Sequence, residues 1–268
     1  MVGSFYLIEA LYFNLVMSQP IVLVSNLTKS YDRIKVVDKI SFEVNQAEIF
    51  GILGPNGAGK TTTLEMMETL RSIDEGRILI NGIDVAINPS AIKKIIGVQP
   101  QAAAFHDKQR LHEIIDLFAA AYGQRVDAKQ LLDQVELGSK ANSYAEQLSG
   151  GQKQRLSIAT ALVHSPKVLF MDEPTTGLDP QARRNLWDLI RLIQSSGVTV
   201  IMTTHYMEEA ELLCDRVAIM DKGKIIALNK PTILIRQLLA KGFKKQVHVE
   251  QANLEDVFID LTGQALRE

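Results

Sequence analysis

The stretch Ile49-Phe-Gly-Ile-Leu-Gly-Pro-Asn-Gly-Ala-Gly-Lys-Thr61 joins a short apolar run to the pattern G-x-x-x-x-G-K-[ST]. The apolar run predicts a strand, and Thr61–Leu70 predicts the helix after it. Glycines let successive N–H groups point at phosphate oxygens, and the helix directs the positive end of its dipole at the same anion. Lys60 would supply a cation for phosphates and Thr61 a hydroxyl for Mg²⁺. The predicted phosphate loop comprises Gly54, Pro55, Asn56, Gly57, Ala58, Gly59, Lys60, Thr61 and Thr62.

A glycine-rich turn that binds nothing is the alternative, and the Lys-Thr pair and the flanking elements argue against it. The pattern alone is shared by kinases, GTPases and many ATPases. The surrounding chain alternates strands with helices, because the apolar runs 167–171 and 198–202 flank a predicted helix at 180–195. This alternation predicts an α/β fold with a parallel sheet. Residues 111–122 and 127–137 have helical spacing with no strand between them, which predicts a locally all-helical region.

Other segments predict a smaller set of strands and helices. The runs 21–25, 40–44 and 77–80 are read as strands, the last entering a tight turn at Asn81-Gly82. Residues 217–226 are read as a hairpin, 231–240 and 254–261 as helices, and 246–250 as a strand.

Composition narrows the class of protein. The 268 residues suggest one to two domains. A formal charge of −2 lacks the basic excess typical of nucleic-acid binding, so no nucleic-acid partner is expected. A single cysteine excludes an internal disulfide. The apolar stretch Phe5–Met17 is interrupted by Glu9 and Asn14 and is shorter than the roughly 20 residues that span a bilayer.

An acidic pair, Asp172-Glu173, follows the apolar run 167–171. Ligands of open α/β sheets bind at the carboxyl ends of strands, which is where these side chains would lie. Asp172 is predicted to hold Mg²⁺, and Glu173 to polarise a water for attack on the γ-phosphate. A solvated acidic loop is the alternative, and the phosphate loop elsewhere in the chain weighs against it.

The order of motifs resembles that of ABC transporter ATPase subunits, over about residues 20–230. The motifs are Gly54–Thr61, Gln101, Leu148-Ser-Gly-Gly-Gln152, Phe170–Glu173, Gly177-Leu-Asp179 and Thr204-His205. The tail Asn253–Thr262 resembles the end of ATPases that serve the type-two exporter group, which includes drug and polysaccharide efflux systems. Gly177 stands where many relatives have alanine. The resemblance implies a P-loop NTPase fold with a RecA-like parallel-sheet core, an antiparallel β subdomain and an inserted α-helical subdomain at about 102–147.

The resemblance also implies roles for single residues. Tyr31 would stack on adenine, although a surface-strand tyrosine is the alternative. Gln101 would contact Mg²⁺ or the attacking water, and His205 would contact the γ-phosphate, where a lone histidine is more often structural. Asp179 would lie at a dimer interface. A neighbouring copy's nucleotide would be contacted by Ser149, Gly150, Gly151 and Gln152.

The predicted function is that of an ATP-hydrolysing subunit that binds ATP and Mg²⁺ and pairs with a second ATPase subunit, expected to be an identical copy. It would power export through integral membrane permease subunits as a peripheral protein on the cytoplasmic face of the cell membrane. The alternative is an ABC ATPase acting on a ribosome or nucleic-acid complex; a single cassette without sustained heptads argues against it. The transported substrate and the direction of transport are not readable from the sequence.

The resemblance divides the chain into three predicted parts. Residues 17–230 form the ATPase domain and 231–268 a short C-terminal extension. Residues 1–16 are an extension of uncertain status, either the product of a misassigned start codon or an amphipathic element lying on the membrane or the permease.

Overall fold

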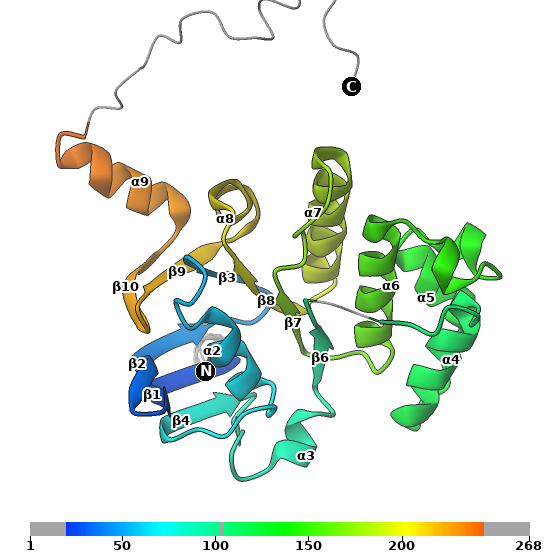
Figure 1. Ribbon diagram of the computed structural model, residues 1–268, viewed down its shortest axis with the longest axis horizontal. Helices are drawn as coiled ribbons and strands as arrows, with labels where there is room; N and C mark the ends of the chain where they lie inside the picture. The colour runs from blue at the N-terminus through cyan, green and yellow to red at the C-terminus, as the bar shows by residue number, and fades with distance from the viewer. Residues whose placement is uncertain (1–19, 102–103, 244–268) are drawn as a thin grey trace, which may run out of the picture. The chain divides into compact units, whose positions relative to one another are not determined.

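The computed structural model describes residues 20–101 and 104–243 (Figure 1). The chain divides into two compact units, one ending at Thr232 and one beginning at Ile233. Helix α9 (Pro231–Ala240) begins at this boundary. Among the described residues, no helix combines the length and the apolar character needed to cross a bilayer.

A six-stranded sheet forms the centre of the first unit, with the order β10-β9-β3-β8-β7-β6. All neighbouring strands pair in parallel except β10, which is antiparallel to β9. Every residue of β3, β7 and β8 is buried, as the apolar runs predict for central strands. The strands are β3 (Ile49–Leu53), β6 (Ile96–Gln99), β7 (Val168–Asp172), β8 (Thr199–Thr204), β9 (Arg216–Asp221) and β10 (Lys224–Asn229).

A second sheet is four-stranded and antiparallel, with the order β2-β1-β4-β5. It confirms the predicted antiparallel β part of the fold. The turn at Asn81-Gly82 joins β4 to β5 with positive φ angles of 49° and 75°, as a two-residue hairpin loop requires. Strand β1 continues past Ser25 because bulges interrupt its pairing without ending it. The strands are β1 (Val22–Tyr31), β2 (Ile34–Val44), β4 (Glu75–Ile80) and β5 (Ile83–Asp84).

Three helices pack against one another beside the β6 edge of the large sheet and form the helical part of the unit (green in Figure 1). They are α4 (Leu111–Ala121), α5 (Ala128–Gln134) and α6 (Gly150–Leu162), and their chain segment lies between β6 and β7. Helices α4 and α5 lie within the predicted helical insertion of about 102–147, whereas α6 begins after it; the bounds of the insertion stay a prediction. The remaining helices of the unit are α2 (Lys60–Met67), α3 (Pro89–Ile92), α7 (Pro180–Ser195) and α8 (Met207–Leu213).

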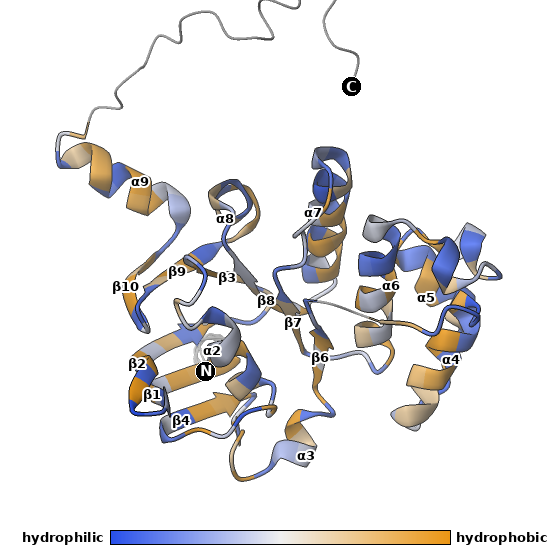
Figure 2. Ribbon diagram, viewed as in Figure 1, coloured by the Kyte–Doolittle hydropathy of each residue, from blue (hydrophilic) through white to orange (hydrophobic). Residues whose placement is uncertain are grey.

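The main core lies between the two sheets. Phe42 of β2 and Phe50 of β3 stack with their ring centroids 5.2 Å apart, and this cluster continues to Phe170 and Ile201. Figure 2 shows the matching hydrophobic colour along β1, β4 and β6. Because the core fixes β3, β7 and β8 side by side, the loops that leave their carboxyl ends meet at one edge.

Some expected elements differ from the structure. The helix expected over 61–70 ends at Met67, because Thr69 takes a left-handed φ of 66° and the N–H groups of Leu70 and Arg71 both donate to Glu65 O. Strand β6 and helix α8 were not expected from the sequence. The predicted elements at 246–250 and 254–261, the exporter-like tail and the extension 1–16 lie outside the described residues.

Candidate functional site

The phosphate loop connects β3 to α2, as the pattern predicts. Gly59 has a φ of 99°, and a Cβ at this position would overlap the carbonyl oxygen of Val36. A side chain is therefore excluded at this position both because the backbone φ is positive and because the carbonyl oxygen leaves no space for a Cβ. Lys60 Nζ donates to Gly54 O at 2.9 Å and to Pro55 O at 3.2 Å, which folds the ammonium back over the loop.

A pocket of about 330 Å³ lies on this loop. Most of the predicted phosphate-loop and catalytic residues converge on it. It is lined by Val36, Asn56, Gly57, Gly59, Lys60, Thr61, Thr62, Gln101 and Glu173. A larger cavity of about 790 Å³ is lined by residues such as Pro166 and Leu192 and contains none of the predicted site residues, so we do not regard it as the reactive site.

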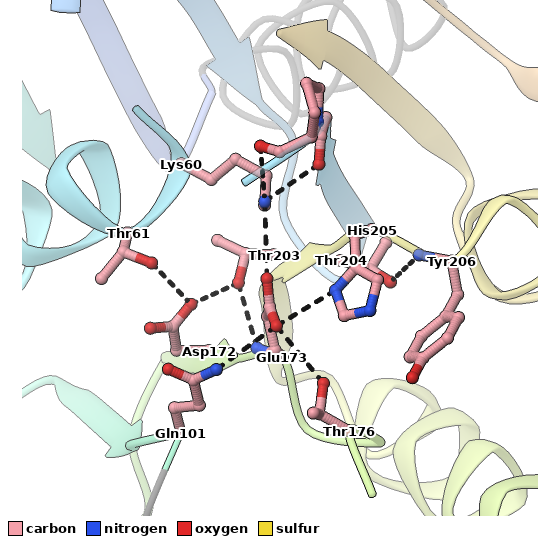
Figure 3. Close-up of polar contacts among 12 residues, drawn as sticks. Lys60, Thr61, Gln101, Asp172, Glu173, Thr176, Thr203, Thr204, His205 and Tyr206 are labelled. Atoms are coloured by element: carbon pink, nitrogen blue, oxygen red, sulfur yellow. Dashed lines mark hydrogen bonds and ion pairs between the residues drawn. The ribbon is translucent and has the colours of Figure 1, made fainter. Parts of the chain in front are cut away.

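Asp172 ends strand β7 with its side chain directed at the start of α2 (Figure 3). The Thr61 hydroxyl donates to Asp172 Oδ1 at 3.3 Å. Thr203 Oγ1 also donates to Asp172 Oδ1 and accepts from Glu173 N at 3.0 Å, so one hydroxyl orients both acids. These oxygens suit Mg²⁺, which takes few protein ligands and keeps water and phosphate oxygens. The described residues contain no cluster of three or more His, Cys, Asp or Glu that could hold a metal ion.

Glu173 is the centre of the polar network (Figure 3). Its Oε1 lies 3.4 Å from Lys60 Nζ. Its Oε2 lies 3.1 Å from His205 Nδ1 and accepts from Gln101 Nε2 and Thr176 Oγ1, each at 3.3 Å. The backbone of Glu173 takes a left-handed φ of 46°, a strained conformation of the kind that clusters at functional sites.

The charge state of Glu173 follows from these neighbours. Burial alone would raise the pKa of its carboxyl, but the neighbouring His205 and the ammonium of Lys60 outweigh burial and lower the pKa. Glu173 is therefore ionised at neutral pH. An ionised carboxylate can accept a proton from a water molecule, which is the chemistry predicted for this residue.

Glu68, just after the end of α2, behaves in the opposite way. It is buried and lines another cavity, of about 480 Å³, next to Phe118 and Tyr122 of the helical part. Burial, followed by the nearby charges of Asp172 and Glu65, raises the pKa of Glu68 to about 8. Its carboxyl is therefore mostly neutral at pH 7.

The glycine-rich segment Leu148–Gln152 begins helix α6. Ser149 is the N-cap: its hydroxyl accepts from Gln152 N, and Gln152 Oε1 accepts from Ser149 N at 3.1 Å, which is a capping box. Lys140 Nζ donates to the same Oε1 at 3.0 Å. The segment borders its own hollow of about 280 Å³, which shares no lining residue with the phosphate pocket. Within one chain, the two pockets are therefore separate.

Two predicted contact residues lie outside the phosphate pocket. Tyr31 is 38% exposed, and its hydroxyl accepts from Arg71 at 3.1 Å. Asp179 is the N-cap of α7, accepting from Ala182 N at 2.7 Å. Their predicted roles at adenine and at a dimer interface stay predictions.

The sequence did not reveal the role of Thr203, which holds both acids, or of Thr176, which holds Glu173. A usable signal was present for Thr203. It is a hydroxyl residue at the end of an apolar strand, directly before the predicted Thr204-His205 pair. No comparable signal marks Thr176.

The phosphate loop lies between a buried parallel strand, β3, and a helix. The acid pair lies at the end of β7, and the histidine follows β8, the strand between β3 and β7. This arrangement is that of a P-loop NTPase. A family model described as ABC transporter matches residues 37–176. The chain is 39% identical over 218 residues to the linearmycin resistance ATP-binding protein LnrL of Bacillus subtilis, covering 80% of this chain and 70% of that protein. It is 41% identical over 220 residues to the Nod factor export ATP-binding protein I of Rhizobium etli, with the same coverage. The chain belongs to the ABC transporter family, as an ATP-binding subunit.

Solved structures agree with this assignment. An ATP-binding subunit of an ABC transporter superposes with a TM-score of 0.73 at 28% identity, over 90% of this chain and 99% of that chain. An ATP-binding cassette of an ABC transporter in its ADP conformation gives a TM-score of 0.75 over 83% of this chain and 96% of that chain. The latter is 22% identical and supports the fold alone.

Proposed function

We propose that this chain hydrolyses MgATP as one of two copies that bind two nucleotides between them and drive export through a separate membrane permease. The observation that carries the proposal is the separation, within one chain, of two pockets that border the two predicted anion sites. One is a phosphate pocket with a base on its rim, and the other borders the glycine-rich segment at the start of α6.

Hydrolysis within the pocket is supported by the placement of Glu173. Its ionised carboxylate would orient and deprotonate the attacking water, while Lys60 and His205 offset the negative charge that develops on the phosphate. Mg²⁺ would be held by Thr61 and Asp172, with Gln101 close enough to join the metal or the water. Bound there, Mg²⁺ would supply positive charge that offsets part of the charge of the nucleotide phosphates.

Dimer formation is supported by the glycine-rich segment. The start of α6 offers backbone N–H groups, the positive end of a helix dipole and the Ser149 hydroxyl. Because this surface does not border the chain's own phosphate pocket, a second copy is the natural source of the phosphate it would bind. We infer a homodimer with head-to-tail contacts, in which Asp179 at the start of α7 lies at the interface.

Export and a permease partner are supported by the names of the relatives, which describe linearmycin resistance and Nod factor export. The helical part carries exposed apolar side chains on α4, namely Leu117 at 56% and Phe118 at 37%. We propose this face as the surface that contacts the permease, with the chain on the cytoplasmic face of the membrane and no nucleic-acid partner.

The test uses two variants and size-exclusion chromatography with light scattering. Glu173→Gln in MgATP should form a stable dimer, because ATP binds but its hydrolysis stops. Ser149→Asp keeps an N-cap acceptor but places a carboxylate where the second copy's phosphate would lie. Adding it to Glu173→Gln should abolish the dimer and leave ATP binding by the monomer intact. A Glu173→Gln protein that remains monomeric at saturating ATP, or that still hydrolyses ATP at the parent rate, contradicts the proposal.

The transport part needs a separate test. A multi-span permease should copurify with the native protein from detergent-solubilised membranes. Copurification with ribosomes instead would leave the ATPase chemistry intact but refute the export role.

A further inference from the structure

Arg183, in the first turns of α7, has an unusual environment. Its guanidinium carbon lies 4.4 Å from the centroid of the Tyr206 ring. Its Nε atom is buried and has no hydrogen-bond partner among the residues described. A buried donor without a partner is costly, so the contact that retains the guanidinium is its stacking on the aromatic face.

Tyr206 connects this cation to the reactive site. Its ring centroid lies 4.1 Å from that of His205, with the two planes tilted by 38° (Figure 3). His205 in turn lies 3.1 Å from Glu173. Three side chains from α7, the N-cap of α8 and the end of β8 therefore form one stack that ends on the catalytic carboxylate.

His205 needs such support, because its side chain is 31% exposed and is not fixed by burial. The turn that carries it is short and is closed by the Tyr206 N–H, which donates to Thr204 Oγ1 at 3.0 Å. This bond fixes the backbone but does not itself hold the imidazole ring. The Tyr206 ring, itself backed by Arg183, covers one face of the imidazole and restricts its rotation.

We propose that Arg183 is a positioning residue that acts through Tyr206 to keep the His205 imidazole oriented toward Glu173 and the γ-phosphate. Arg183 does not border the phosphate pocket, so it would affect the rate of the chemical step and leave ATP affinity nearly unchanged. The proposal rests on ATP hydrolysis by this chain, as proposed above.

The first turn of α7, which carries Arg183, is held in place by two contacts. Asp179 caps the helix, and Ala182 lies against the glycine-rich segment, since a Cβ on Gly151 would sit 3.3 Å from the Ala182 Cβ. Arg183 is thus attached to an element that is fixed at both its cap and its side.

The kinetic test compares Arg183→Met, which keeps the length of the side chain and removes the cation, with Arg184→Met. Arg184 is the exposed neighbour on the same helix and serves as the matched control. Cation–π contacts of about 0.5–2 kcal/mol correspond to about 2- to 30-fold in rate. We expect Arg183→Met to lower kcat by about 3- to 10-fold with KM for ATP within about twofold, and Arg184→Met to leave kcat unchanged.

Tyr206 variants and a double mutant separate positioning from simple packing. Tyr206→Phe keeps the ring and should retain most of kcat, whereas Tyr206→Leu should match Arg183→Met. In a His205→Ala background, Arg183→Met should cause no further loss, because the residue it acts through is gone. A kcat of Arg183→Met equal to that of Arg184→Met, or fully additive losses in the double mutant, overturns the proposal.

A spectroscopic readout is independent of activity. The chain has five histidines, so the His205 imidazole protons can be assigned by the His205→Gln variant. Stacking on Tyr206 should displace these resonances upfield. Arg183→Met should move them toward random-coil positions and Arg184→Met should not. If the parent fails to hydrolyse ATP, the proposed function fails, and an unmoved His205 resonance in Arg183→Met still refutes the stack by itself.

Discussion

Replacing Glu173 by Gln should tighten ATP binding by a single copy, because Glu173 and a nucleotide phosphate compete for the same cation. Lys60 Nζ lies 3.4 Å from Glu173 Oε1, and 4% and 9% of the two side chains are exposed. A phosphate that binds Lys60 must draw the ammonium from this carboxylate. Gln keeps the shape of the side chain and removes the competing charge.

The size of the effect can be bounded from the geometry. Two unit charges 3.4 Å apart interact by about 5 kcal/mol at an effective dielectric constant of about 20. Only part of this is recovered on binding, since Lys60 keeps its hydrogen bonds to the carbonyls of Gly54 and Pro55 and since water rehydrates the carboxylate. We expect a gain of about 1–2 kcal/mol, which lowers the Kd by about 5- to 30-fold.

The assay is isothermal titration with the non-hydrolysable analogue AMPPNP and Mg²⁺. All proteins carry Ser149→Asp, so that trapping of a dimer does not contribute to the apparent affinity. Glu208→Gln is the matched control, because Glu208 is an exposed carboxylate that follows His205 by three residues. Without nucleotide, the Glu173→Gln protein should also unfold at a lower urea concentration, since a buried ammonium has lost its partner.

The reasoning is refuted if Glu173→Gln changes the Kd by less than about twofold relative to Glu208→Gln, the smallest difference that such titrations separate from error. A weaker affinity would show that Glu173 helps to bind the nucleotide and does not compete with it.

Three further predictions concern stability. The folded pKa of Glu68, about 8, exceeds its ordinary value of 4.5. As the pH rises between these values, the contribution of Glu68 to the free energy of unfolding should fall by about 1.4 kcal/mol per pH unit. Urea unfolding of Glu68→Gln without Mg²⁺ should lack that contribution. Thr203→Val should cost about 1–3 kcal/mol in urea unfolding and impair hydrolysis, because Asp172 loses a donor, whereas Thr203→Ser should stay close to the parent. Gly59→Ala should cost at least about 1–3 kcal/mol and abolish ATP binding in the same titration, because its Cβ overlaps Val36 O.

Much of the site could be predicted because its residues lie at strand ends. Once parallel strands are recognised, topology brings the carboxyl ends of β3, β7 and β8 together. Glu173 and His205 directly follow two of these strands, and Lys60 follows the third after the phosphate loop, so their convergence depends mainly on backbone placement. The helix bounds of α7 were readable for a similar local reason, since Asp179 and Pro180 are a strong N-terminal signal.

What the sequence could not reveal depends on side-chain choices between distant segments. Nothing in the local sequence indicates that Glu173 pairs with Lys60, which is more than a hundred residues away, or that Arg183 stacks on Tyr206. Strand β6 was missed because it has four residues, one of them Gly97, and because its partner β7 supplies the pairing. The pKa of Glu68 depends in the same way on burial that only the folded chain provides.

The strain at Glu173 has a bearing on how the site is maintained. A left-handed φ of 46° costs roughly 1–3 kcal/mol for a residue with a side chain. The Thr203 hydroxyl offsets part of that cost by accepting from the Glu173 N–H, and the same hydroxyl donates to Asp172. The proposed metal ligand Asp172 and the proposed base Glu173 therefore share one support. A shift of Thr203 would disturb both acids together, which would couple the proposed metal ligand to the proposed base.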